Sequence, residues 1–183
     1  MVNERDLIYD WNKVQSEPHR NPGSHPHPVW FDDETLRDGL QSPSARNPSI
    51  EQKIELLSFM EDLGIQKVDL GLPGAGQFHL SHIDSLLSHM RSNDYQIRPG
   101  CAVRTVISDI EPLIELQSRH EIQIQASAFL GTSPIRQYAE GWTMEKIMNT
   151  AEVAVEFAVD NDIPVMFVTE DTTRSRPDEI KAV

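Results

Sequence analysis

The sequence contains one cysteine, Cys101, among 183 residues. An internal disulfide is therefore excluded, and the composition suits a reducing cytoplasm. No apolar run approaches the roughly 20 residues that cross a bilayer. The N-terminus, MVNERDLIYD, carries charged residues where a signal peptide would have an apolar core. We therefore expect a cytoplasmic protein without a membrane partner.

Basic residues are also scarce. The chain has 16 Lys and Arg residues against 29 Asp and Glu residues, which gives a formal net charge of -13. Phosphate backbones require a concentrated basic surface, so a nucleic-acid partner is excluded. No glycine fingerprint of a dinucleotide site and no phosphate-binding loop follows a predicted strand. The partners to expect are small-molecule substrates.

Residues 1–28 are polar and interrupted by prolines, which predicts an N-terminal arm or tail. From residue 29 onward, short β-rich runs alternate with helical patterns. The predicted strands are 29–36, 67–74, 97–104, 122–130 and 164–171. Alternation of this kind predicts an α/β fold with a parallel sheet. It fits either an open doubly wound sheet or the first five units of an eight-stranded barrel, and the missing glycine fingerprint favours the barrel.

Helix signals separate these runs. Ser49 and Gln52 have the spacing of a capping box, and Gly64 marks the end of the helix that follows. Ser108 and Glu111 have the same spacing and predict a second capping box. Apolar residues at helical spacing predict further helices over 79–92 and 143–160, and Pro177 begins a fifth. Because the chain ends shortly afterwards, we expect it to be part of a longer barrel.

Polar residues follow nearly every predicted strand. In a parallel barrel the active site lies at the carboxyl ends of the strands, so these residues are the candidates for chemistry. The histidines of His25-Pro26-His27 precede the first strand, and those on the second helix face the outer ring, so neither group is expected to bind a metal. The strand-end candidates are Arg37, Asp38, Gln41, Asp69, Arg104, Thr132, Ser133, Arg136, Thr169 and Glu170.

One of these strand ends, DETLRDGLQ at 33–41, resembles the signature of the DRE-TIM metallolyases, also called the HMGL-like family. Three further segments are similar to that family: VDLGLPGAG at 68–76, GTSPIRQ at 131–137 and FVTEDTTRS at 167–175. The family holds 2-isopropylmalate synthase, homocitrate synthase and 3-hydroxy-3-methylglutaryl-CoA lyase. The resemblance implies a TIM (β/α)8 barrel of the pyruvate carboxyltransferase type, of which residues 29–183 are the N-terminal part.

The resemblance also implies a reaction. These enzymes join an acyl-CoA to a 2-oxo acid held by a divalent metal, Mg, Mn or Zn, that acts as a Lewis acid. Asp38 matches the metal-binding aspartate, and Arg37 matches the arginine that stabilises the enolate oxygen. Gln41 matches a residue that supports the ligand, and Glu170 a carboxylate for substrate contact or proton transfer. Gly39 is expected to let the backbone bend between them. We expect acetyl-CoA as co-substrate and a homodimer.

The sequence departs from the family pattern at three places. Asp69 stands where glutamate is usual, and Arg136 stands where histidine is usual, so Arg136 favours an extra carboxylate or a phosphate of the acyl-CoA. The metal-binding His-x-His of the seventh strand has no counterpart here. The remaining strand-end residues, Arg104, Thr132, Ser133 and Thr169, are expected to bind substrate. Two alternatives stay open: cleavage by a lyase, or a truncated non-catalytic chain that needs a partner for the missing strands.

Overall fold

A computed structural model describes Leu7 and residues 29–183. Its five strands form one sheet in the order β1-β2-β3-β4-β5, and every neighbouring pair is parallel. The strands are β1 (Asp32–Asp33), β2 (Lys67–Asp69), β3 (Arg98–Arg104), β4 (Gln125–Phe129) and β5 (Val165–Val168). A doubly wound sheet would reverse its strand order at a switch point. Sequential order without a reversal is the winding of a barrel, and the prediction of a partial barrel is confirmed.

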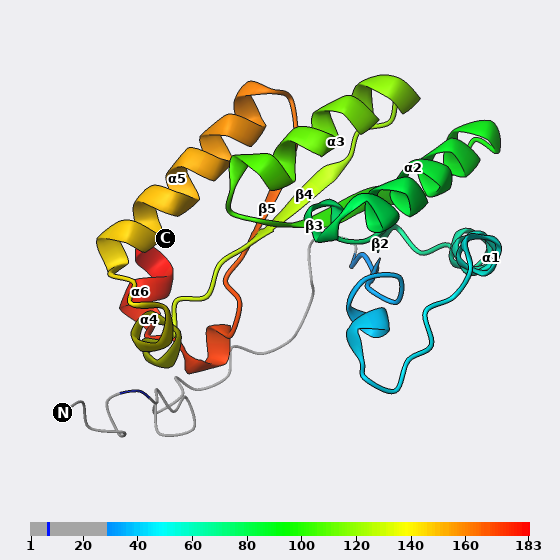
Figure 1. Ribbon diagram of the computed structural model, residues 1–183. Helices are drawn as coiled ribbons and strands as arrows, with labels where there is room; N and C mark the ends of the chain where they lie inside the picture. The colour runs from blue at the N-terminus through cyan, green and yellow to red at the C-terminus, as the bar shows by residue number, and fades with distance from the viewer. Residues whose placement is uncertain (1–6, 8–28) are drawn as a thin grey trace.

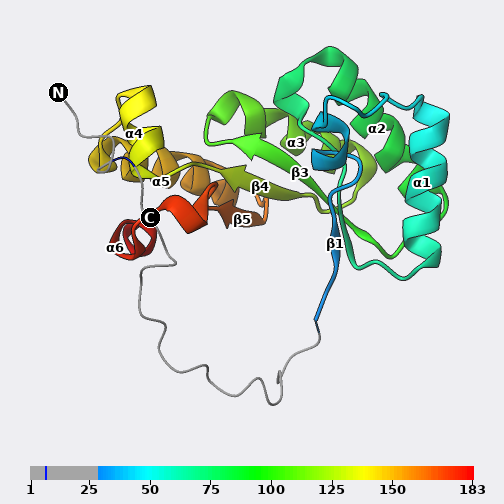
Figure 2. The ribbon, with the colours of Figure 1, turned by 90° about the horizontal axis from the view of Figure 1, so that it is seen from below.

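Helices cover one side of this sheet. Figures 1 and 2 show α2, α3 and α5 side by side over the strands, with α1 next to α2 at the β1 end. The helices are α1 (Ile50–Asp62), α2 (Gln77–Ser92), α3 (Ile107–His120), α4 (Pro134–Glu140), α5 (Met144–Asp160) and α6 (Pro177–Ala182). Short 3-10 turns follow three of the strands: η3 (Asp38–Gln41), η4 (Pro73–Ala75) and η5 (Thr172–Arg174).

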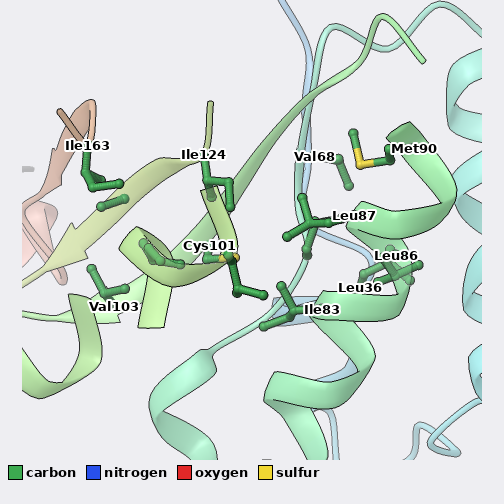
Figure 3. Close-up of a cluster of buried hydrophobic side chains, with 14 of the residues drawn as sticks. Leu36, Val68, Ile83, Leu86, Leu87, Met90, Cys101, Val103, Ile124 and Ile163 are labelled. Carbon is green, nitrogen blue, oxygen red and sulfur yellow. The ribbon is translucent and has the colours of Figure 1, made fainter. Parts of the chain in front are cut away.

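The hydrophobic core lies between the helices and one face of the sheet. Figure 3 shows Val68 near Leu87 of α2 and Cys101 near Ile83, with Val103 farther along the same cluster. Cys101 is fully buried, as predicted for a small core residue. Because strand side chains alternate between faces, the intervening residues lie on the opposite, concave face. They include Lys67, Asp69, Gln125, Ser127 and Phe129, so the concave face is largely polar.

Several predicted boundaries are confirmed. Ser49 and Gln52 form the capping box of α1, with each side chain accepting a hydrogen bond from the other residue's backbone N–H. Gly64 follows the end of α1 with a φ of 73°, the left-handed conformation that glycine adopts at helix ends. Both features are local, which is why the sequence alone identified them.

The second predicted capping box is wrong. Helix α3 begins at Ile107, so Ser108 lies inside its first turn, and the N-cap residue Val106 makes no side-chain hydrogen bond. Asp109, one turn in, instead accepts a hydrogen bond from the backbone N–H of Arg104. Helix α4 was not predicted, and its N-cap is Ser133.

Strand β1 is shorter than the predicted 29–36. The Asp33 carboxylate accepts a hydrogen bond from the backbone N–H of Thr35 at 2.8 Å, which turns the chain out of the strand. The carbonyl of Glu34 then accepts from the N–H groups of both Arg37 and Gly39. The polar end of this strand is therefore a hydrogen-bonded turn.

Two expectations fall on residues that the structure does not describe. The predicted arm lies at residues 1–28, of which only Leu7 is described, and it contains His25-Pro26-His27. The division of the chain at residue 29 stays a prediction. Among the described residues, no helix combines the length and the apolar composition that a membrane crossing requires.

Candidate active site

The turn after β1 places Arg37 among three carboxylates. Its Nε lies 3.1 Å from Glu34 Oε2 and 3.7 Å from Asp69 Oδ2, and its Nη1 lies 3.2 Å from Asp38 Oδ1. The Arg37 side chain is 22% exposed, so it is partly desolvated but still reaches the surface of the concave face. The guanidinium keeps its positive charge at all pH values of interest, and the three carboxylates hold it in place while offsetting part of that charge.

Asp69 is the most buried of these carboxylates. Its Oδ1 accepts hydrogen bonds from the backbone N–H groups of Gly71, at 2.9 Å, and Ala102, at 3.3 Å, whereas its Oδ2 has no hydrogen-bond partner among the described residues. Burial raises the pKa of Asp69 to about 7, and the neighbouring Glu34 carboxylate adds to the increase. The two backbone hydrogen bonds and Arg37 oppose it. A carboxyl group with this pKa can gain or lose a proton near neutral pH.

Asp38 lies at the edge of this cluster. Its side chain is 68% exposed, and its carboxylate faces the guanidinium of Arg37. Gln41 is also exposed and makes no hydrogen bond to Asp38, so its supporting role stays a prediction. The expectation for Gly39 is not met: the bend is a 3-10 turn, and a Cβ at Gly39 would lie 3.7 Å or more from every neighbour.

A second polar cluster lies after β4 and β5. Ser133 Oγ donates a hydrogen bond to Asp171 Oδ2, and Arg136 Nη2 lies 3.7 Å from Glu170 Oε2. Asp171 has a φ of 51°, a left-handed conformation that is uncommon for a residue other than glycine. A Cβ at Gly131 would lie 3.1 to 3.5 Å from atoms of Arg136, Asp171 and Glu170, so the chain after β4 passes close to these side chains. Glu170 and Arg136 are therefore brought together, as an ion pair that is about 40% exposed.

The threonines at these strand ends differ in accessibility. Thr132 is fully buried and donates to the hydroxyl of Ser175 at 2.8 Å, which ties the β4 end to the chain after β5. Thr169 is partly exposed, and its hydroxyl lies 2.7 Å from that of Thr172. Thr169 borders a cavity of the concave face, whereas Thr132 has no exposed surface, so the position of Thr132 favours a structural role.

Arg104 at the end of β3 is held by α3. Its Nε and Nη2 both donate to the carboxylate of Asp109 at 2.7 Å, and this bond raises the pKa of Arg104. Asp109 is 1% exposed, so the pair satisfies a buried carboxylate. The structure therefore separates Arg104 from both clusters, and its predicted contact with substrate remains a prediction.

A cavity of about 380 Å³ on the concave face joins the two ends of the sheet. Glu34 and Arg37 border it from the β1 side, and Thr169 and Thr172 border it from the β5 side. Its floor includes Ser127 and Phe129 of β4. We call this space the mouth cavity. It is large enough for a small organic acid, and it presents a cation on one side and hydroxyl groups on the other.

The described residues do not by themselves form a metal site. No group of three or more His, Cys, Asp or Glu side chains among them is placed to hold an ion. Asp38 is the predicted ligand, but its carboxylate is engaged by Arg37 and has no second donor residue beside it. A hard divalent cation requires several oxygen or nitrogen ligands at once. Asp38 could contribute one of them.

Glu34 belongs to the cluster around Arg37 but was not among the candidates from the sequence. It lies within the DETLRDGLQ segment, 3.1 Å from Arg37, and its pKa is raised by burial against the opposing effect of Arg37. The available signal was a further acidic residue in the segment that already offered Asp38 and Arg37 as candidates. Asp171, which accepts from Ser133, was also missed as a site residue.

Comparison with known proteins shows which family the chain is similar to. The family model described as HMGL-like matches residues 28–183. A homocitrate synthase AksA of Methanosarcina acetivorans is 27% identical over 150 residues, which is 81% of this chain and 35% of that protein. A 2-isopropylmalate synthase of Streptococcus gallolyticus is 32% identical over 156 residues, which is 85% of this chain and 29% of that protein.

A 2-isopropylmalate synthase of Sediminispirochaeta smaragdinae gives a similar result, with 27% identity over 152 residues and coverage of 29% of that protein. The chain thus spans about a third of the length of the curated relatives it matches. The family match, in contrast, extends over nearly all of the described residues, and the sheet has the sequential parallel order of a TIM barrel. The chain therefore belongs to the HMGL-like family.

Proposed function

We propose that the protein to which this chain belongs condenses an acyl-CoA, acetyl-CoA in the first instance, with a 2-oxo acid. The observation that carries the proposal is the position of Arg37, which borders the mouth cavity between Glu34 and Asp69. The names of the relatives, 2-isopropylmalate synthase and homocitrate synthase, support a synthase. The GLPGAG segment after β2 favours the same branch of the family over the lyase.

Arg37 is assigned to the oxygen on which charge develops. Removing a proton from the acyl group converts the thioester carbonyl to an enolate, and the guanidinium stabilises that negative charge. The enolate carbon then forms a bond to the ketone carbon of the 2-oxo acid, and water hydrolyses the thioester to release free coenzyme A. Glu34 and Asp69 keep the guanidinium oriented, since each carboxylate lies within 4 Å of its Nε.

Two carboxyl groups are candidates for moving the proton. Asp69 has a pKa of about 7 and can exchange a proton near neutral pH, but only its Oδ2 is free of backbone hydrogen bonds. Glu170 is more accessible and lies in the second cluster with Arg136. We assign Glu170 to substrate contact or proton transfer, with Arg136 binding an additional carboxylate or phosphate. The proposed reaction includes a divalent metal, which would need further ligands in addition to those among the described residues.

The test is a thiol-release assay on the complete protein with acetyl-CoA and 2-oxoisovalerate, run beside a cleavage assay with a 3-hydroxy-3-methylglutaryl-CoA substrate. Release of free thiol that depends on the 2-oxo acid supports the synthase. Cleavage without condensation would reassign the protein to the lyase branch. Asp38→Ala is expected to abolish metal-dependent turnover, and unchanged turnover in that variant would remove Asp38 from the site. Cytoplasmic location and a homodimer stay predictions.

A further inference from the structure

A second, smaller pocket lies outside the concave face. It has a volume of about 210 Å³ and is formed where the turn after β1 and the turn after β2 meet the first turns of α1 and α2. We call it the side pocket. Its polar lining residues are Arg37, Gln41, Asn47, Lys53, His79 and His82. Among the described residues, no Asp or Glu side chain lines it, although the chain as a whole carries 29 acidic residues and 16 basic ones.

Lys53 is the central group of the side pocket. It is 4% exposed and lies on the buried face of α1 with Leu57 and Met60, where an apolar residue is the rule. No carboxylate and no other hydrogen-bond acceptor among the described residues pairs with its ammonium group. Burial lowers the pKa of Lys53. Although the residue as a whole is buried, Nζ is not among the fully buried polar atoms that lack a partner, so it keeps exposed surface. The ammonium group therefore opens into the side pocket, where an anion can pair with it.

His82 supplies an independent indication. Its Nδ1 is buried and has no hydrogen-bond partner among the described residues. The ring packs at 4.3 Å between centroids against Phe78, and Lys53 Nζ lies 6.0 Å from the centroid of the same Phe78 ring. Both groups therefore lie beside the same ring, although Phe78 is half exposed and does not itself line the side pocket.

Two of the three charges that act on His82 are positive, those of Lys53 and His79. Burial lowers its pKa, and the positive charges of Lys53 and His79 lower it further, while only the exposed Glu51 acts in the opposite direction. At neutral pH the imidazole is therefore uncharged and carries one N–H donor. An anion between Lys53 and His82 would reverse these effects and raise the pKa of both groups.

We propose that the side pocket binds a small oxyanion, of the size and charge of a phosphate group, between Lys53 and His82. The volume is below that of most pockets for whole cofactors, so it suits a single charged group. The group is either a free anion or the charged end of a larger molecule. This inference does not depend on the proposed condensation, because it concerns binding and not turnover.

The experiment is a calorimetric titration of the full chain with inorganic phosphate, with parallel titrations of acetate and coenzyme A. Lys53→Met keeps the length and the apolar stem of the side chain but removes the charge. We expect the dissociation constant for phosphate to rise about 10-fold or more, the usual effect of losing a charged hydrogen bond. Lys146→Met, which removes an exposed lysine on α5, is the matched control and should change it less than about 2-fold.

A second measurement covers the case in which Lys53→Met fails to fold. The imidazole of His82 in the unmodified chain is followed by NMR with and without phosphate, and its pKa is expected to rise on binding. His82→Gln identifies the signal and should weaken phosphate binding. Binding of coenzyme A but not of free phosphate would identify the group as part of a larger molecule, and selective binding of acetate would identify a carboxylate. If neither Lys53 nor His82 affects the binding of any of the three probes, the inference is wrong.

Discussion

The guanidinium Nε of Arg37 lies 3.7 Å from Oδ2 of Asp69, which joins the turn after β1 to the last residue of the neighbouring strand β2. Asp69 Oδ2 has no hydrogen-bond partner among the described residues, and Arg37 is the nearest cation. The pair connects a buried group that can titrate near neutral pH with a cation that borders the mouth cavity. Substituting Asp69 therefore tests how this pair affects stability, and substituting Arg37 tests its role in the proposed reaction.

The first prediction concerns the pH dependence of stability. The pKa of Asp69 in the folded chain, about 7, lies above the value of about 4 for an unfolded aspartate. The folded state therefore holds an extra proton between these values, and Asp69 makes the free energy of unfolding decrease as the pH rises through this range. Between pH 5 and 8 this decrease amounts to about 2–3 kcal/mol.

Asp69→Asn should remove that decrease, because the amide keeps an oxygen for Gly71 and Ala102 but does not titrate. Urea unfolding at pH 5 and pH 8 measures the effect. Asp62→Asn, at an exposed position of α1, is the control and should keep the slope of the unmodified chain. An equal pH slope in the unmodified chain and in Asp69→Asn would contradict the raised pKa.

The second prediction concerns Arg37 in the complete protein. Arg37→Lys keeps the positive charge but loses the planar fork that contacts Glu34 and Asp38 simultaneously. We expect kcat to fall about 100-fold, with a smaller rise in KM for the 2-oxo acid, the pattern of an interaction made mainly in the transition state. Arg91→Lys, in an exposed pair with Glu121, should leave both constants unchanged. A change confined to KM would reassign Arg37 to substrate binding.

The order of strands and helices was predictable because each strand and each helix has apolar residues at its own regular spacing. Leu57 and Met60 on α1, and Cys101 and Val103 on β3, bury apolar side chains at the spacing of their element. The contacts that organise the site are not periodic. The hydrogen bond from Ala102 N–H to Asp69 joins residues 33 apart, and nothing in the local sequence of either predicts it.

Failures of the sequence prediction have the same origin. Ser108 and Glu111 have the spacing of a capping box, but the pairing of Arg104 with Asp109 fixes where α3 begins. Lys53 has the spacing of a core residue on α1, yet the α1 pattern was interpreted from its apolar residues only. The position of Lys53 among the buried residues of α1 was therefore the one feature of the sequence that indicated the side pocket.

The third prediction compares Ser49 and Ser108, which both have the sequence spacing of a capping box. Ser49→Ala removes the acceptor for Gln52 N–H and should lower the free energy of unfolding by about 1 kcal/mol. Ser108→Ala should change it by less than about 0.5 kcal/mol, since Ser108 is exposed and caps nothing. Chemical denaturation of both variants measures the difference. Equal losses would show that Ser108 also acts as a cap.

The fourth prediction concerns metal binding by the chain of 183 residues. Asp38 is a single exposed carboxylate paired with Arg37, and the described residues offer it no companion ligands. We therefore expect no tight one-to-one binding of Mn²⁺ or Zn²⁺ and no condensing activity in this chain alone. Calorimetry with each ion and the thiol-release assay test both statements. Stoichiometric tight binding that is lost in Asp38→Ala would show that the site is complete without further strands.

The last prediction compares two glycines in the turns after β1 and β2. A Cβ at Gly74 would lie 2.3 to 2.6 Å from the carboxylate atoms of Asp109, the buried partner of Arg104, whereas a Cβ at Gly39 meets only ordinary contacts. Gly74→Ala should therefore lower the free energy of unfolding by about 1–3 kcal/mol, because the Arg104–Asp109 pair must move. Gly39→Ala should change it by less than about 0.5 kcal/mol.

Thermal unfolding of both variants measures these changes, and Arg104→Gln in each background identifies their cause. If Gly74→Ala acts by displacing Asp109 from Arg104, the two substitutions are coupled and cost less together than the sum of their separate effects. If the losses caused by Gly74→Ala and Arg104→Gln simply add, the added Cβ destabilises η4 without displacing Asp109 from Arg104. A large loss in Gly39→Ala would restore the original expectation that the signature glycine is needed for the bend, and would contradict the turn geometry described above.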